Sequence, residues 1–201
     1  MSRALLIVDV QNDFCPGGSL AVSDGDRILP AVNRLIREFT AAGLPVFATR
    51  DWHPEDHCSF RARGGCWPPH CVAGTRGAAF HPELQLTPDV HVVDKGERQE
   101  QEAYSGFEGT DLASRLRELG VDEIVVCGLA TDYCVKATAL DARREGLGVT
   151  VVEDAVRGVE LEPGDSERAL AAMRQAGVQT VPEAAPYLGS LRVGDDADCA
   201  R

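Results

Sequence analysis

The sequence has little positive charge and no long apolar run, and both features limit what the protein can be. Its 201 residues include 20 lysines and arginines against 32 acidic residues, a formal net charge of −12 at pH 7. Nucleic-acid binding depends on clustered cations that neutralise phosphates, so we expect no nucleic-acid partner. The apolar run over 4–8 meets Asp9 and is too short for a secretory signal or a membrane span. We therefore expect a cytoplasmic protein with no membrane partner.

Low-complexity segments and internal repeats are also missing, and the length suits one well-buried α/β domain. We expect this single domain to span residues 1–201, with a core over about 4–182 and a C-terminal extension over 183–201. In such a chain the seven cysteines are expected to be reduced thiols, and their odd number forbids complete internal pairing. The sequence allows a homo-oligomer without requiring one.

Short apolar stretches alternate along the chain with segments whose apolar residues have helical spacing. The short stretches, rich in Val, Ile and Leu, predict buried parallel strands over 4–10, 45–49, 90–94, 123–129, 148–152 and 178–181. Helical spacing occurs over 28–39, 112–119, 135–142 and 169–173, and each segment ends near a glycine. The alternation predicts a doubly wound, mainly parallel six-stranded sheet with helices on both faces, a Rossmann-like three-layer α/β fold. The long segment 52–87 lacks a predicted helix, and loops of this kind are often functional.

Polar residues follow the first four predicted strands, at the edge where a parallel sheet binds its ligands. Asp9 follows the first strand, Asp51 the second and Lys95 the third, and the fourth strand leads to Cys134. Since the carboxyl ends of parallel strands meet at one edge, we expect these four side chains to converge.

Cys134 lies at the start of a predicted helix, where unpaired N–H groups and the helix dipole stabilise a thiolate and lower its pKa. This position favours a nucleophile, with an inert buried thiol as the alternative. A nucleophilic thiol needs a base. Asp9, held near the ammonium of Lys95, can accept the thiol proton and return it to a leaving group. The alternative is that Asp9 only caps the next turn.

A second group of polar residues is typical of a catalytic metal site. Asp51 and His53 point to the same side of an extended segment, and His70 can reach the same ion from the long loop. One carboxylate and two imidazoles leave coordination positions open, and they suit one divalent ion, Zn²⁺ first and Fe²⁺ or Mn²⁺ as alternatives. His57 is a candidate fourth ligand.

Two alternatives compete with this metal site. The Asp-x-His pattern is short enough to arise from ordinary polar loop residues. A structural zinc knot could instead use His70 with Cys58, Cys66 and Cys71, although these cysteines lack the usual C-x-x-C pair.

Six ordered sequence blocks now suggest a family. They are IVDVQNDF at 7–14 with PGGSL at 16–20, TRDWHP at 49–54, WPPHCV at 67–72, KG at 95–96, AYSGF at 103–107 and GLATDYCV at 128–135. With these blocks, which run from about residue 4 to 177, the sequence resembles the nicotinamidase/pyrazinamidase family of the isochorismatase-like cysteine hydrolases. The metal-loop blocks carry the resemblance to the nicotinamidase branch.

The resemblance implies an isochorismatase-like fold and the hydrolysis of nicotinamide to nicotinate and ammonia in NAD salvage, with pyrazinamide-like amides as further substrates. It implies a catalytic triad of Asp9, Lys95 and Cys134. It implies metal ligation by Asp51, His53 and His70 as well, and leaves His57 open because the additional histidine differs among relatives.

The resemblance also implies an oxyanion hole formed by the backbone N–H groups of Ala130 and Cys134, beside a cis peptide bond between Leu129 and Ala130. A small aromatic amide is then expected to bind against Phe14, Trp67, Tyr104 and Leu129. The alternative hypotheses are a hydrolase of the same superfamily with another small substrate, and a catalytically silent module that binds a metal or ligand.

Overall fold

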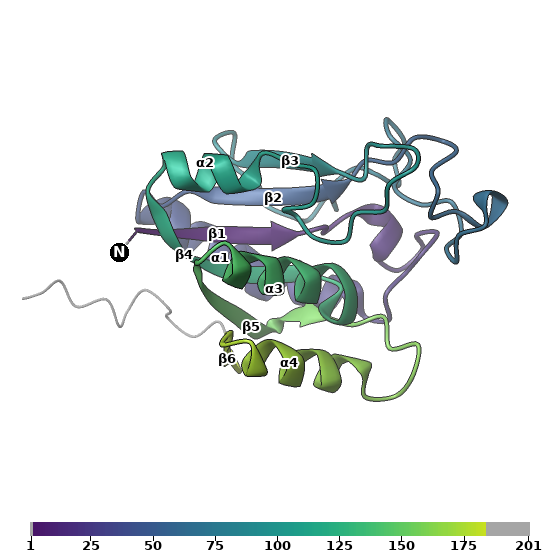
Figure 1. Cartoon of the computed structure of the whole chain (residues 1–201). Helices are drawn as coiled ribbons and strands as arrows, with labels where there is room; N and C mark the ends of the chain where they lie inside the picture. The colour runs from purple at the N-terminus through teal and green to yellow at the C-terminus, as the bar shows by residue number, and fades with distance from the viewer. Residues whose placement is uncertain (1, 184–201) are drawn as a thin grey trace, which may run out of the picture.

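Six parallel strands form one sheet within residues 2–183, the part of the chain that the computed structural model describes. Their order is β3-β2-β1-β4-β5-β6 (Figure 1). The strands are β1 Ser2–Val8, β2 Val46–Asp51, β3 His91–Lys95, β4 Val121–Leu129, β5 Gly148–Arg157 and β6 Gln179–Val181. This sheet confirms the predicted doubly wound α/β fold. The expected extension over 183–201 lies, beyond its first residue, outside the described residues.

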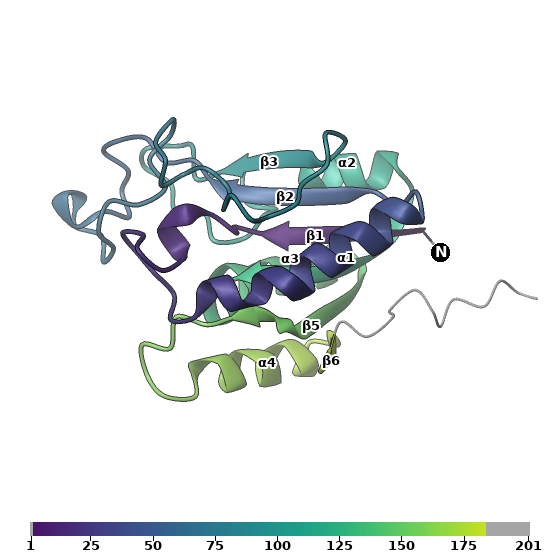
Figure 2. The same ribbon diagram turned by 180° about the vertical axis from the view of Figure 1, so that it is seen from behind.

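Helices cover both faces of the sheet (Figures 1 and 2). Helix α1, Leu29–Ala41, packs on one face, and α2 Leu112–Glu118, α3 Lys136–Arg144 and α4 Asp165–Gln175 pack on the other. None of the described helices has the length and apolar character needed to cross a membrane.

Alternation along the central strand β1 supplies both halves of the core. Leu5 and Ile7 pack with α1, whereas Leu6 and Val8 face the helices on the opposite side. Helix α1 buries a stripe at helical spacing, made of Val32, Leu35, Ile36 and Phe39. Burying each such side chain contributes about 1.5–3 kcal/mol, so packing of this stripe fixes α1 on the sheet.

The direction in which the chain crosses the sheet reverses between the neighbouring strands β1 and β4. The carboxyl ends of these strands flank a crevice, which is where open α/β sheets bind ligands. Long loops gather at this edge of the sheet (Figure 1). Among them is the segment over 52–87, which contains a short 3-10 turn, Arg61–Arg63, and no α-helix, as the sequence predicts.

Several strand ends differ from the prediction, among them those of β1 and β5. Strand β1 ends at Val8, because Asp9 has a φ of 48° and turns the chain out of the sheet. Strand β5 continues five residues beyond the predicted end at Val152. Glu153 and Asp154 interrupt the apolar pattern there, but pairing with β4 resumes after a register shift and reaches Arg157.

Gly128 allows β1 and β4 to approach closely beside the crevice. It has a φ of 114°, and a Cβ at this position would lie 2.0 Å from the carbonyl oxygen of Val8. Any larger residue must therefore push the two central strands apart, immediately before Asp9 and the Leu129 peptide.

We expect Gly128→Ala to lower the free energy of unfolding by about 3 kcal/mol or more, the sum of overpacking and an unfavourable positive φ. Gly43→Ala is the matched control, because Gly43 also has a positive φ, 66°, but nothing lies within 4 Å of a Cβ there. The control should lose only about 1–2 kcal/mol. Urea denaturation measures both, and equal losses would contradict the close contact at Gly128.

Candidate active site

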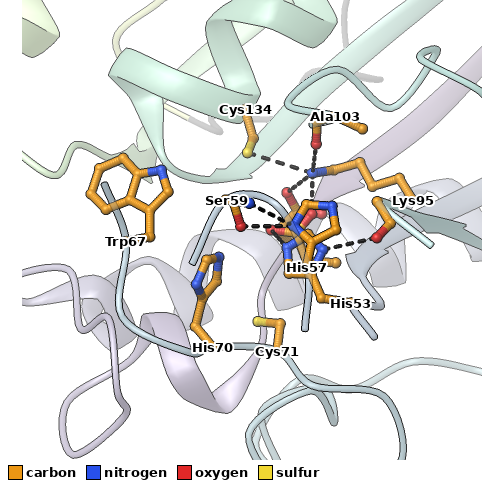
Figure 3. A network of polar contacts seen from close by, with 12 residues as sticks. His53, His57, Ser59, Trp67, His70, Cys71, Lys95, Ala103 and Cys134 are labelled. Carbon is orange, nitrogen blue, oxygen red and sulfur yellow. Dashed lines mark hydrogen bonds and ion pairs between the residues drawn. The ribbon is translucent and has the colours of Figure 1, made fainter. Parts of the chain in front are cut away.

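The ammonium group of Lys95 lies at the centre of a buried polar cluster (Figure 3). Its Nζ is 3.0 Å from Oδ2 of Asp9 and 3.6 Å from Sγ of Cys134. It also donates to the carbonyl oxygen of Ala103 at 3.1 Å and to Oδ1 of Asp51. The structure therefore brings together the four polar residues that follow the first four strands.

Strand pairing explains this convergence. Asp51 ends β2 and is paired in register with Lys95, which ends β3. Asp9 follows β1, and its N–H donates to the carbonyl of Thr49 in β2 at 3.2 Å. The Thr49 hydroxyl donates to Oδ1 of Asp9 at 2.7 Å, so that Oδ2 is left to face Lys95.

Burial and the ammonium of Lys95 act in opposite directions on the two neighbouring groups. Burial raises the pKa of the Asp9 carboxyl, and Lys95 opposes this. Burial also raises the pKa of the Cys134 thiol well above its usual value, again opposed by Lys95. For Lys95 itself, burial would lower the pKa, but Asp51 and Asp9 outweigh it and raise the pKa well above the usual value. The expected lowering of the Cys134 pKa is thus wrong: desolvation dominates, and the thiol needs a base.

Asp51, His53 and His70 offer three ligand atoms that lie within 4.8 Å of one another. The Nδ1–H of His53 donates to the Gly96 carbonyl at 2.9 Å, and the Nδ1–H of His70 donates to the Pro68 carbonyl at 2.8 Å. Because each Nδ1 faces a group that can only accept, each Nε2 keeps its lone pair for a metal.

The carboxylate of Asp51 serves both clusters. Its Oδ1 accepts from Lys95, and its Oδ2 lies 3.6 Å from Nε2 of His53. Burial would raise the pKa of Asp51, but Lys95 and His53 outweigh it and lower the pKa, so this carboxylate is ionised. One anionic oxygen and two imidazole nitrogens, all buried, fit a divalent metal ion.

His57 does not offer a ligand atom to this group. Its Nδ1 accepts from the hydroxyl of Ser59 at 2.7 Å, and its Nε2–H donates to the carbonyl of Gln101 at 3.0 Å. Its ring stacks on that of His53 with the centroids 4.2 Å apart (Figure 3). Both nitrogens of the candidate fourth ligand are therefore engaged elsewhere, and His57 supports the ring of His53 instead.

The alternative zinc knot in the long loop does not form. Within residues 2–183, the groups of three closely spaced potential ligands are Asp51–His53–His70 and Asp9–Asp51–Cys134. Neither group includes the loop cysteines at positions 58, 66 and 71. The six described cysteines are free thiols, and Cys199 lies outside the described residues.

Cys134 lies in a π-helical turn, Thr131–Val135, that leads from β4 into α3. The peptide bond between Leu129 and Ala130 is cis, as the resemblance implies. The carbonyl of Ala130 accepts from the N–H groups of Tyr133 at 3.1 Å and Val135 at 3.0 Å, but not from that of Cys134 between them. The Ala130 carbonyl therefore does not occupy the N–H of Cys134, which suits the oxyanion role that the resemblance implies.

An aromatic pocket lies next to the thiol. Its lining includes Phe14, Trp67 and Tyr104, which the sequence indicates, and also Tyr133. The indole N–H of Trp67 donates to the Tyr104 hydroxyl at 3.0 Å. The ring of Tyr133 packs against both, with centroid distances of 5.2 Å to Trp67 and 5.6 Å to Tyr104. These aromatic walls suit a flat ring.

The pocket corrects the sequence analysis at two further positions. Leu129 is 1% exposed and packs in the core on the α1 side, so it does not line the pocket. Val159, in the loop after β5, does line it. The carboxylate of Asp132 accepts from the N–H groups of Val159 and Glu160, both at 2.9 Å, and so fixes this wall to the turn that carries Cys134. Tyr133 lies within the GLATDYCV block, which could have indicated it. No sequence signal indicated Val159.

Comparison with known proteins agrees with this geometry. The sequence matches the isochorismatase domain family over residues 3–184. It is 43% identical to a nicotinamidase of Escherichia coli, over 87% of this chain and 92% of that protein. It is 47% identical to a nicotinamidase/pyrazinamidase of Mycobacterium tuberculosis, over 89% and 98% respectively.

A solved structure leads to the same family. The crystal structure of the Pyrococcus horikoshii pyrazinamidase in complex with zinc is similar, with a TM-score of 0.87 and 51% sequence identity, over 90% of this chain and 99% of that one. A parallel α/β fold with a buried thiol, carboxylate and ammonium at the strand ends defines a hydrolase of the cysteine type. The chain belongs to the isochorismatase family, within its nicotinamidase/pyrazinamidase branch.

Proposed function

We propose that this protein hydrolyses nicotinamide to nicotinate and ammonia through a thioester on Cys134, with pyrazinamide-like amides as further substrates. The observation that carries the proposal is the contact of Lys95 with both Asp9 and Cys134. This contact lies beside an aromatic pocket that also presents the ligands Asp51 and His70. The relatives named above carry the same activity in their names.

Asp9 acts as the general base in the first step. Burial raises its pKa, which makes its carboxylate a stronger proton acceptor than an exposed one. It takes the proton of Cys134 as the sulfur adds to the carboxamide carbon. Lys95, 3.6 Å from that sulfur, stabilises the negative charge that develops there.

The backbone N–H groups of Ala130 and Cys134 hold the tetrahedral oxyanion. Removing a donor of this kind typically costs about 2.7–4 kcal/mol of transition-state stabilisation. The C–N bond then breaks, Asp9 returns its proton to the departing nitrogen, and ammonia leaves. The acyl group remains on the sulfur as a thioester.

Water completes the cycle. Asp9, once more a carboxylate, takes a proton from a water molecule as the water oxygen attacks the thioester carbon. The C–S bond breaks as the proton passes from Asp9 to the sulfur, which restores the thiol of Cys134, and the acid product leaves and loses its carboxyl proton to the solvent as nicotinate.

A divalent ion, Zn²⁺ by preference, would be held by Asp51, His53 and His70 and would orient the substrate ring through its nitrogen, directly or through a water. Protein side chains beside the metal site also orient the substrate ring, independently of the metal. Trp67 and Tyr104, joined by their hydrogen bond, form an aromatic wall that leaves a flat ring few orientations.

We also propose that the chain works as one domain in the cytoplasm. The free thiols of the six described cysteines suit a reducing compartment.

A measurement of ammonia release from nicotinamide, pyrazinamide and benzamide, with metal content determined on the same sample, tests the function. We expect turnover of the first two and much slower turnover of benzamide, which has no ring nitrogen. Release from none of the three would rule out the proposed activity, and equal release from all three would rule out a role for the ring nitrogen.

Removal of the metal gives a separate prediction. We expect protein dialysed against a chelator to lose kcat/KM for nicotinamide by on the order of 100-fold, because metal-ion contributions are worth several kcal/mol. Added Zn²⁺ should restore the activity. Undiminished turnover by protein shown to be free of metal would remove Asp51, His53 and His70 from the active role.

A further inference from the structure

We propose that Asp13 is a positioning residue that sets His53 and His70 in place for the metal by holding the backbone of Cys71. This inference rests on the metal site of the proposed function. Asp13 follows β1 by five residues, whereas Cys71 lies in the long loop, directly after His70.

Cys71 connects Asp13 to both histidines. Its N–H donates to Oδ2 of Asp13 at 2.7 Å. Its carbonyl accepts from the backbone N–H of His53 at 3.0 Å, and its N-terminal neighbour is His70. One oxygen of the Asp13 carboxylate therefore anchors Cys71, which is covalently bonded to His70 and hydrogen-bonded to the backbone of His53.

The conformation of Cys71 explains why an anchor is needed. Its φ is 46°, in the left-handed region that residues other than glycine rarely adopt. Such a conformation persists when surrounding contacts determine it. A charged acceptor on the N–H side and the His53 N–H on the carbonyl side supply those contacts.

The loop wraps closely around the Asp13 side chain. The second carboxylate oxygen, Oδ1, accepts from the N–H of Ser19 at 3.1 Å. The Asp13 N–H donates to the carbonyl of Gly77 at 3.1 Å, and a Cβ on Gly77 would lie 2.1 Å from Oδ2 of Asp13. A side chain at position 77 would therefore displace the Asp13 carboxylate, so the loop that carries His70 packs directly against Asp13.

The third metal ligand, Asp51, is held separately by Gln11, which lies in the same segment after β1 as Asp13. The side-chain oxygen of Gln11 accepts from the Asp51 N–H at 2.8 Å, and its amide nitrogen donates to the Asp51 carbonyl at 2.8 Å. Loss of the Asp13 carboxylate should therefore loosen the two histidines while Asp51 stays in place.

The test is the affinity of the metal-free protein for Zn²⁺, measured by competition with a chromophoric chelator. We expect Asp13→Ala to weaken Zn²⁺ binding by about 10–100-fold, the usual effect of removing a group that orients a ligand. Asp13→Asn should lose less, because its oxygen can still accept from Cys71 while its NH₂ group faces the Ser19 N–H. Melting of the metal-free proteins and circular dichroism establish that each variant is folded.

Glu160→Ala is the matched control. Glu160 also accepts two backbone N–H bonds, from Gly164 at 2.9 Å and Ser166 at 2.8 Å, but in the loop after β5. The Zn²⁺ affinity of the Glu160→Ala variant should equal that of the unmodified protein. A purely structural role for Asp13 would lower the melting temperature and leave the Zn²⁺ affinity unchanged.

The outcomes separate this inference from the proposed function. Unchanged affinity in folded Asp13→Ala overturns the inference and leaves the metal site standing. If Asp13→Ala does not fold, Asp13→Ser decides, because its shorter side chain cannot keep the bond to the Cys71 N–H, and affinity equal to that of the unmodified protein overturns the inference. If the unmodified protein itself binds no Zn²⁺, the proposed metal site fails and the inference falls with it.

Discussion

Replacement of Cys134 by alanine should lower kcat for ammonia release from nicotinamide by on the order of 10⁴-fold or more, since Cys134 supplies the thiol in the lining of the described pocket. The side chain is 6% exposed and small, so its shortening removes a single buried sulfur atom. The fold and the Zn²⁺ affinity should therefore remain. Steady-state kinetics, circular dichroism and metal analysis on the same sample measure the three properties.

Cys66→Ala is the control for this variant. Cys66 is exposed and precedes Trp67 in the pocket wall, so it tests whether a nearby thiol contributes. We expect it to retain most of the activity. The proposal fails if Cys134→Ala retains more than about a hundredth of the original kcat, because an enzyme that has lost its single nucleophile should not keep that much activity.

Lys95→Met should impair both catalysis and folding. The variant leaves the carboxylates of Asp9 and Asp51 buried without their shared cation. Breaking a buried ion pair by removal of one partner costs about 3–5 kcal/mol, so we expect a loss of stability of that order in urea denaturation. Without Lys95, the main group that opposes the effect of burial on the pKa of Asp9 is lost, so this pKa rises further and less of the carboxylate is available as a base. We expect kcat to fall by about 10³-fold.

Asp9→Asn separates the two effects of Lys95. It removes the base while Lys95 keeps its contact with Asp51 and its bond to the Ala103 carbonyl. We expect a loss of kcat similar to that of Lys95→Met, with a smaller loss of stability. If Asp9→Asn were fully active, Asp9 would not be the base and the mechanism would need another proton acceptor.

Most of the fold follows from local patterns in the sequence. Buried parallel strands are continuous apolar runs, and helix α1 repeats apolar residues at helical spacing, so both types of element carry their own signal. The end of β5 carries none. Glu153 and Asp154 lie at an irregularity in the pairing with β4, and strand pairing depends on a partner far away in the sequence.

The candidate site is predictable to the extent that strand ends and short motifs reveal it. The sequence predicts that Asp51 and Lys95 converge at one edge of the sheet, but it assigns Asp51 to the metal group and Lys95 to the base, with no contact between them. In the structure the two are paired across β2 and β3, and one carboxylate serves both groups. Only the order and register of the strands create this contact, and neither can be derived from a strand in isolation.

Contacts with backbone groups are hardest to predict. Asp13 and Cys71 are 58 residues apart, and the group that Asp13 binds is a backbone N–H that nearly every residue has. The pKa of Cys134 is equally hard to predict: its place before α3 suggests stabilisation of a thiolate, but burial has the larger effect. Burial is a property of the folded chain, and the residues around Cys134 come from several segments.

The central claim is that nicotinamide is hydrolysed through a thioester on Cys134. The most direct test is mass spectrometry of the protein after acid quenching within the first turnover of nicotinamide. We predict one nicotinoyl group per chain, on the peptide that contains Cys134 and on no other peptide. Ammonia released in that turnover with the Cys134 peptide unmodified, or with the nicotinoyl group on another residue, would contradict the account.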